Sequence, residues 1–290
     1  MELLHRLSSG ISGPTTGQPP RASGRRFVVV LTCLLAACAA TGPREPAPVP
    51  SPLSGKPFAE PPRGTAATTP GPTRSELEVP GHGKAVLSLP AAELGRRPVL
   101  LVAHGAGDRP EWQCDWWESA LGGRAVVLCL RGSAMYPRRS DTGYYFRHHY
   151  ALEDEALAAL DALEREHGTR LAPGPAVYAG FSQGAIMGAL FVAKHPERFR
   201  RVLLIEGGFD EWNVATARRF AAGGGARVLF ACGQTYCASH ARASMRWLGL
   251  GGVNARLELA RGAGHTYAGD VGERVLAAFP WLVDGDPRWR

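Results

Sequence analysis

A serine between two glycines lies near the middle of the chain, in the segment Gly180-Phe181-Ser182-Gln183-Gly184. An apolar run precedes this segment and small residues follow it, so the pattern predicts a strand, a tight turn and a helix. Such a turn exposes the hydroxyl of Ser182, and glycines on either side let the two backbones approach more closely than a Cβ would allow. The amide of Gln183, at the start of the helix, lacks an intrahelical partner. The segment therefore predicts a nucleophile beside a donor that can stabilise a developing oxyanion.

A histidine that could activate this hydroxyl occurs near the C-terminus, in Gly264-His265. An imidazole titrates near pH 6.5, so it can take a proton from a serine and return it to a leaving group at neutral pH. His240 lies inside a helical pattern, which favours a structural or exposed position. His265 is therefore the predicted general base.

The elements that must hold these residues alternate along the chain. A hairpin is expected at 75–79 and 84–89, around Pro80-Gly81-His82-Gly83, because two β-like runs flank turn residues. Further strands are expected at 98–103, 124–130, 176–179, 202–206, 227–232 and 255–260. Helices are expected at 110–121, 150–167, 183–194, 214–222, 238–248 and 271–282. Alternation of this kind predicts a mostly parallel central sheet with helices on both faces.

Three motifs in this order resemble the α/β-hydrolase family from about residue 75 to the C-terminus. They are the strand followed by His104-Gly105-Ala106-Gly107, the Ser182 turn, and the Gly264-His265 loop before the last helix. The resemblance implies that Ser182 is the nucleophile and His265 its base. It also implies an oxyanion hole formed by the backbone amides of Gln183 and Ala106.

The acid of the expected triad departs from the usual pattern of that family. Its common place follows the strand at 227–232, yet residues 233–236 are Gly-Gln-Thr-Tyr. Some members carry the acid at the end of the preceding strand, where this chain has Glu206. A carboxylate that ends an apolar strand is costly to bury without a partner. Glu206 is therefore the first choice, followed by Asp210 and Asp270.

The surroundings of the site are expected to be open. Only 20 residues separate Glu206 from the strand that begins at 227, too few for a large lid domain. Candidate substrate contacts are His104, Trp112 and Tyr144. For His104 the alternative is support of its own loop, and for Trp112 it is packing on the sheet.

These observations favour a serine hydrolase that cleaves carboxylic esters, with a small-molecule or acyl ester as substrate, no metal and no cofactor. A peptidase or polyester hydrolase would use the same acyl transfer. The missing acid at the usual position leaves another alternative, a catalytically silent, lipid-anchored binding domain on the same fold. The protein is expected to act as a monomer. The formal net charge is +7, but no basic stripe with aromatic residues appears, so nucleic acid is not an expected partner.

The N-terminal segment predicts export. Arg25 and Arg26 precede an apolar run of 14 residues, which is too short to span a bilayer and suits a secretory signal. The run ends in Leu35-Ala36-Ala37-Cys38, which resembles a bacterial lipobox with Cys38 as the lipidated residue. Ten prolines follow between 43 and 72, a composition typical of an extended tether. We therefore expect a signal peptide at 1–37, a tether at 38–74 and a catalytic domain at 75–290, anchored on the periplasmic side of the outer membrane or at the cell surface.

Four further cysteines, Cys114, Cys129, Cys232 and Cys237, belong to the expected domain. An even number in an exported protein predicts two disulfides. Cys232 and Cys237 would close a short loop, which leaves Cys114 to pair with Cys129. Four reduced, buried thiols are the alternative.

Overall fold

The computed structural model of this protein describes residues 71–290. The predicted signal peptide at 1–37, the predicted lipidation site Cys38 and nearly all of the predicted tether at 38–74 lie outside the described residues. Within residues 71–290, no helix combines the length and the apolar character that crossing a bilayer requires.

An eight-stranded sheet forms the centre of the described domain, in the order β1-β2-β4-β3-β7-β8-β9-β10. β1 and β2 form the expected antiparallel hairpin, β2 also pairs antiparallel with β4, and every other pair is parallel. The parallel strands are almost continuous apolar runs because helices cover both of their faces. The strands are β1 (Thr73–Leu77), β2 (Ala85–Leu89), β3 (Val99–Ala103), β4 (Val126–Cys129), β7 (Ala176–Phe181), β8 (Phe199–Ile205), β9 (Arg227–Cys232) and β10 (Asn254–Leu259).

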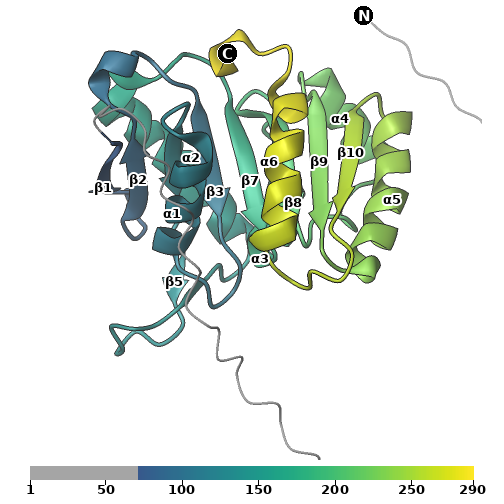
Figure 1. Ribbon diagram of the computed structural model, residues 1–290, viewed down its shortest axis with the longest axis horizontal. Helices are drawn as coiled ribbons and strands as arrows, with labels where there is room; N and C mark the ends of the chain where they lie inside the picture. Colours follow the sequence, from purple (N-terminus) through teal and green to yellow (C-terminus); the bar gives the residue numbers. More distant parts are fainter. Residues whose placement is uncertain (1–70) are drawn as a thin grey trace, which may run out of the picture. The chain divides into compact units, whose positions relative to one another are not determined.

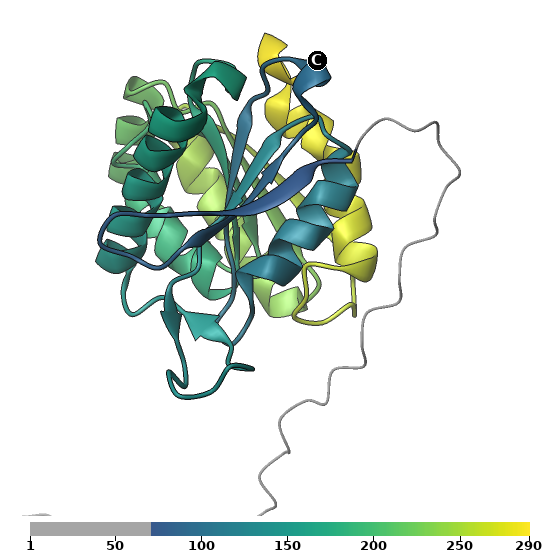
Figure 2. The ribbon, with the colours of Figure 1, turned by 90° about the vertical axis from the view of Figure 1, so that its left-hand side faces the viewer.

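The α-helices of residues 71–290 pack on this sheet in two layers, an arrangement that Figures 1 and 2 show. α1 (Pro110–Leu121) and α6 (Gly269–Val283) cover one face, where Trp117 packs against Phe279. The opposite face is covered by α2 (His149–His167), α3 (Gln183–Val192), α4 (Val214–Ala222) and α5 (Thr235–Leu250). Short 3-10 turns occur at Ala92–Leu94, Gly168–Arg170 and Pro287–Trp289. The predicted sheet with helices on both faces is confirmed.

The connections differ from the expectation at one place. The segment 131–148 contains a small hairpin of β5 (Ser133–Ala134) and β6 (Tyr144–Tyr145), which projects beyond the sheet in Figure 2. Sequence reasoning missed it because strands of two residues carry no periodicity. The connection from β8 to β9 contains only α4, so no large lid is present among the described residues.

Two disulfides tie the domain together. Cys114 of α1 is bonded to Cys129 of β4, with their Cα atoms 5.9 Å apart. Cys232, the last residue of β9, is bonded to Cys237 in the first turn of α5, with a Cα–Cα distance of 5.7 Å. The predicted pairing is the one in the structure, and the alternative of four reduced thiols is not.

Candidate active site

The turn between β7 and α3 places the Ser182 side chain at the C-terminal edge of the sheet. Ser182 has φ 50° and ψ −113°, a conformation that L-residues rarely adopt and that surrounding structure must hold in place. A Cβ on Gly180 would lie 2.6 Å from the carbonyl oxygen of Gly184, and one on Gly184 would overlap the carbonyl of Ala103. Both glycines are therefore required by the close approach of strand, helix and neighbouring loop.

His265 approaches this serine from the loop between β10 and α6. Its Nε2 lies 2.8 Å from Oγ of Ser182, a hydrogen-bond distance that connects residues 83 positions apart. Its ring also packs against Phe181, with ring centroids 5.2 Å apart. The His265 side chain is 46% exposed, so a substrate bound at Ser182 can reach the imidazole.

Glu206 lies directly after β8, on the other side of His265. Its side chain is only 1% exposed, and its Oε2 lies 3.5 Å from Nδ1 of His265. Its Oε1 accepts hydrogen bonds from the amides of Gly233 and Gln234, the latter at 3.2 Å. Burial of this carboxylate is tolerable because each oxygen faces a polar partner. Glu206 also has a positive φ of 53°, so the chain holds the acid in an unfavourable backbone conformation.

The two other carboxylates considered for this position lie elsewhere. Asp210 pairs with His240, whose Nδ1 is 2.8 Å from its Oδ1, and both side chains are exposed. Asp270 lies in the first turn of α6 and lines a surface hollow together with Arg261 and Arg274. Glu206 is thus the carboxylate of the three whose oxygen faces Nδ1 of His265.

The loop after β3 lies against the Ser182 turn. A Cβ on Gly105 would be 3.1 Å from the Cβ of Ser182, and the amide of Gly184 donates to the carbonyl of His104 at 3.1 Å. Ala106 is the next, exposed residue of this loop. The amide of Gln183 lies in the first turn of α3, where it has no intrahelical acceptor. The two amides expected to form an oxyanion hole therefore belong to adjoining segments beside Ser182.

The side chain of His104 contacts the backbone of this loop. Its side chain is buried, with Nδ1 2.7 Å from the carbonyl oxygen of Gly105 and Nε2 2.9 Å from that of Arg131. The ring stacks on Phe146 at a centroid distance of 4.8 Å. Both ring nitrogens therefore face backbone oxygens. This placement agrees with the loop-supporting alternative and leaves His104 no free nitrogen for a substrate.

Tyr144 and Trp112, the other expected substrate contacts, also have defined places. Tyr144 lies in β6, where its carbonyl accepts from the amide of Gly107 at 2.8 Å and its amide donates to the carbonyl of Asp108 at 2.9 Å. Its hydroxyl accepts from Nη1 of Arg131 at 3.3 Å. The β5–β6 hairpin is thus hydrogen-bonded through its backbone to Gly107 and Asp108, which follow Ala106 in the loop after β3. Trp112 is half exposed on α1.

Two supports of the site escaped the sequence analysis. The side-chain oxygen of Gln183 accepts from the amide of Phe146 at 2.7 Å, which links the Ser182 turn to the connection before α2. Gly143 precedes β6, and a Cβ there would overlap the carbonyl of Gly107. A glycine next to Tyr144 was the available signal, but its partner lies 36 residues away in the sequence and no local pattern names it.

Burial shifts the pKa of two side chains near the site, those of Asp108 and Tyr267. Burial raises the pKa of Asp108, although Oδ2 accepts from Nε2 of Gln113 at 3.0 Å and Oδ1 from the amide of Arg109 at 2.8 Å. Burial likewise raises the pKa of Tyr267, whose ring packs edge-on against Phe181. Among residues 71–290, no group of three His, Cys, Asp or Glu side chains gathers closely enough to hold a metal ion.

Comparison with known proteins extends this description at the level of the fold. No family model matches the chain, and no curated protein matches it in sequence. The structure of TT1662 from Thermus thermophilus is similar with a TM-score of 0.58 at 16% identity, covering 74% of this chain and 99% of that one. A dienelactone hydrolase from Anabaena variabilis gives a TM-score of 0.52 at 16% identity, covering 73% and 97%. Est1E from Butyrivibrio proteoclasticus gives a TM-score of 0.52 at 14% identity, and the match covers 72% of this chain and 97% of Est1E.

These similarities and the strand order together show that the chain has the α/β-hydrolase fold. Sequence identities this low establish a shared fold but not a shared reaction, because proteins with the same fold catalyse many different reactions. The site must therefore be interpreted from its own residues.

Proposed function

We propose that this protein is a serine hydrolase that cleaves carboxylic esters through an acyl-enzyme. The observation that carries the proposal is the continuous arrangement of Ser182, His265 and Glu206, with 2.8 Å between hydroxyl and imidazole and 3.5 Å between imidazole and carboxylate. This order of roles, nucleophile, base and orienting acid, is the one that acyl transfer by serine requires.

The acylation step uses each group once. Nε2 of His265 accepts the hydroxyl proton as Oγ of Ser182 attacks the ester carbonyl. The imidazolium that forms is stabilised by the carboxylate of Glu206, which keeps the ring oriented through Nδ1. Negative charge moves onto the carbonyl oxygen, where the amides of Gln183 and Ala106 are proposed to donate to it. His265 then returns the proton to the departing alcohol.

Deacylation repeats the sequence with water in place of the serine hydroxyl. Water enters because the site is open: His265 is half exposed and only α4 connects β8 to β9. His265 takes a proton from water, hydroxide attacks the acyl carbon, and Ser182 leaves with the proton restored. Neither step needs a group other than the side chains and amides described.

The open site favours esters whose acyl or alcohol part extends into solvent. A dienelactone hydrolase and Est1E are among the structural neighbours, and Est1E is also known with ferulic acid bound. A first panel of substrates should therefore contain short p-nitrophenyl esters, an aryl ester such as methyl ferulate, a lactone and a polyester. A peptide substrate tests the peptidase alternative with the same nucleophile.

The test of the proposal compares the wild-type protein with Ser182→Ala. Hydrolysis of p-nitrophenyl acetate and labelling by a fluorophosphonate probe should both disappear in the variant, while its circular dichroism and Tm stay close to wild type. Turnover that survives Ser182→Ala would refute the proposal. A wild-type protein that neither hydrolyses the panel nor reacts with the probe would support the silent binding domain.

We also propose that the domain is carried outside the cytoplasm on a lipid anchor at Cys38. The support is sequence alone: paired arginines, a 14-residue apolar run, a lipobox-like segment and a proline-rich stretch follow one another. In a bacterial host, full-length protein should partition with membranes and incorporate labelled palmitate, and Cys38→Ser should lose both. Cytoplasmic recovery of the wild-type chain without lipid would refute the anchor and leave the hydrolase proposal untouched.

A further inference from the structure

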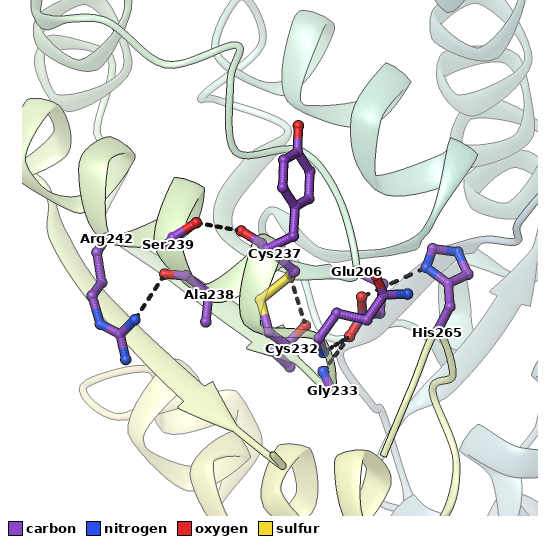
Figure 3. The surroundings of a disulfide bond; sticks show 11 residues. Glu206, Cys232, Gly233, Cys237, Ala238, Ser239, Arg242 and His265 are labelled. Atoms are coloured by element: carbon purple, nitrogen blue, oxygen red, sulfur yellow. Dashed lines mark hydrogen bonds and ion pairs between the residues drawn. A yellow bond between two sulfur atoms is a disulfide. The ribbon is translucent and has the colours of Figure 1, made fainter. Parts of the chain in front are cut away.

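The two oxygens of the Glu206 carboxylate have separate partners, as Figure 3 shows. Oε2 faces Nδ1 of His265, while Oε1 accepts from the amides of Gly233 and Gln234. The side chain is buried, so these contacts determine where the carboxylate lies. The position of Glu206 relative to His265 therefore depends on the turn that contains the two amides.

This turn is held at both ends by one disulfide. Cys232 ends β9 immediately before Gly233, and Cys237 lies in the first turn of α5. Both cysteines are buried, and the bond between them lies beside Glu206 in Figure 3. Gln234, the residue before α5, makes no side-chain capping hydrogen bond to the helix. The start of α5 therefore has no side-chain cap, and the disulfide is what joins it covalently to the end of β9.

The same turn also touches the loop that carries His265. The carbonyl of Gly233 accepts from the amide of Gly262 at 3.1 Å, and the carbonyl of Cys232 accepts from the amide of Ala260 at 2.8 Å. A Cβ on Gly233 would overlap the carbonyl of Gly264, the residue before His265. One short turn therefore lies between the acid and the base and contacts both.

We propose that the Cys232–Cys237 disulfide is a positioning element for the acid and base of the site. By fixing the turn at 233 and 234, it keeps two amides on Glu206 and keeps Glu206 against His265. This inference rests on the proposed hydrolase function. It predicts that loss of the bond lowers the rate of chemistry on folded enzyme, in addition to any effect on stability.

The chain offers a matched control in its second disulfide. Cys114–Cys129 joins α1 to β4 across a sequence separation of 15 residues, and no hydrogen bond of either cysteine reaches Ser182, Glu206 or His265. The local bond closes a separation of only 5 residues, so it restrains the unfolded chain less than the control bond does. A purely structural role would therefore make the control bond the more important of the two.

The experiment compares two paired variants of the full chain, Cys232→Ser with Cys237→Ser and Cys114→Ser with Cys129→Ser. Steady-state hydrolysis of a p-nitrophenyl ester is measured from pH 5 to 9, well below each variant's Tm. For the 232/237 pair we expect kcat to fall about 10-fold, with KM within twofold of wild type. A fall in kcat at unchanged KM is the result expected when the acid and base are misplaced while the substrate still binds. For the 114/129 pair we expect a lower Tm with kcat unchanged.

Several results would overturn the inference. Wild-type kcat in the 232/237 pair would refute it while leaving the hydrolase proposal intact. Equal losses of kcat in both pairs would assign the effect to stability. If the wild type shows no Ser182-dependent turnover, the hydrolase proposal fails, and the NMR chemical shifts of the His265 ring test the positioning role separately. Ring shifts that change in the 232/237 pair and not in the 114/129 pair then support the positioning role, and unchanged ring shifts refute it.

A reversible measurement covers the case in which the 232/237 pair does not fold. The 114/129 variant retains only the Cys232–Cys237 bond among the described cysteines. Dithiothreitol donates two electrons and two protons to this bond, yielding two thiols, and itself becomes a cyclic disulfide. Activity of the folded variant should fall on reduction and return on reoxidation. Full activity with both thiols titrated as free would refute the inference.

Discussion

Replacement of the buried acid by its amide, Glu206→Gln, tests the arrangement of the site most directly. Glutamine has nearly the same shape as glutamate and can still accept from the amides of Gly233 and Gln234. The change removes the negative charge that faces Nδ1 of His265 at 3.5 Å. It therefore isolates the electrostatic role of the carboxylate from its role in packing.

The distance sets the size of the expected effect. At the observed 3.5 Å, two unit charges attract by about 4.7 kcal/mol with an effective dielectric constant of about 20, and by about 1.2 kcal/mol in water. His265 is half exposed while Glu206 is buried, so an intermediate value of about 2–4 kcal/mol is expected for the imidazolium formed in the transition state. Such a loss corresponds to a decrease in kcat of about 30- to 1000-fold.

The assay is steady-state hydrolysis of a p-nitrophenyl ester, with kcat and KM determined separately. KM should change little, because the Glu206 side chain is buried and does not reach a bound substrate. Asp210→Asn and Asp270→Asn serve as matched controls and should keep kcat within about twofold. The reasoning would be refuted if Glu206→Gln retained wild-type kcat, or if one of the two aspartate variants lost activity instead.

Two further changes test supports of the site. Burial raises the pKa of Asp108 above its ordinary 3.8, so the folded protein binds this proton more tightly and stability falls as pH rises through the raised value. Asp108→Asn, with Gln113 still able to bond it, should therefore have a higher Tm than wild type at pH 7, by about 2–4 °C for each kcal/mol removed, and the same Tm as wild type at pH 3. A difference in Tm between variant and wild type that is the same at both pH values would contradict this. Gly184→Ala would push a methyl into the carbonyl of Ala103 and should cost about 1–3 kcal/mol and most of kcat. Gly249→Ala is the control for Gly184→Ala, because its Cβ would meet nothing within 4 Å, and it should be neutral or slightly stabilising in thermal denaturation.

The long elements of this fold could be predicted because each has a single strong pattern. The helix at Pro110–Leu121 begins at a proline and ends before a left-handed glycine, and its predicted bounds match the structure. The start of α5 was placed three residues late, at Ala238 instead of Thr235. No side chain caps this helix, so the usual signal for a helix start was missing.

The parts of the site that could not be predicted depend on contacts between distant segments. Glu206 is a candidate from the sequence because a carboxylate at the end of an apolar strand needs a partner. Its contact with His265 can be identified only in the folded structure, because the two residues are far apart in the sequence. The backbone pairing of Tyr144 with the Ala106 loop has no sequence signature, since amides and carbonyls are common to all residues. For the same reason, the bond from the Phe146 amide to Gln183 appears only in the structure.

The tight fit of Gly233 against Gly264 limits how this protein can change. A carboxylate introduced at position 233, the first residue after β9, would need space that the carbonyl of Gly264 already occupies. A carboxylate at 233 could therefore take over the proposed role of Glu206 only if the loop that carries His265 moved away from β9.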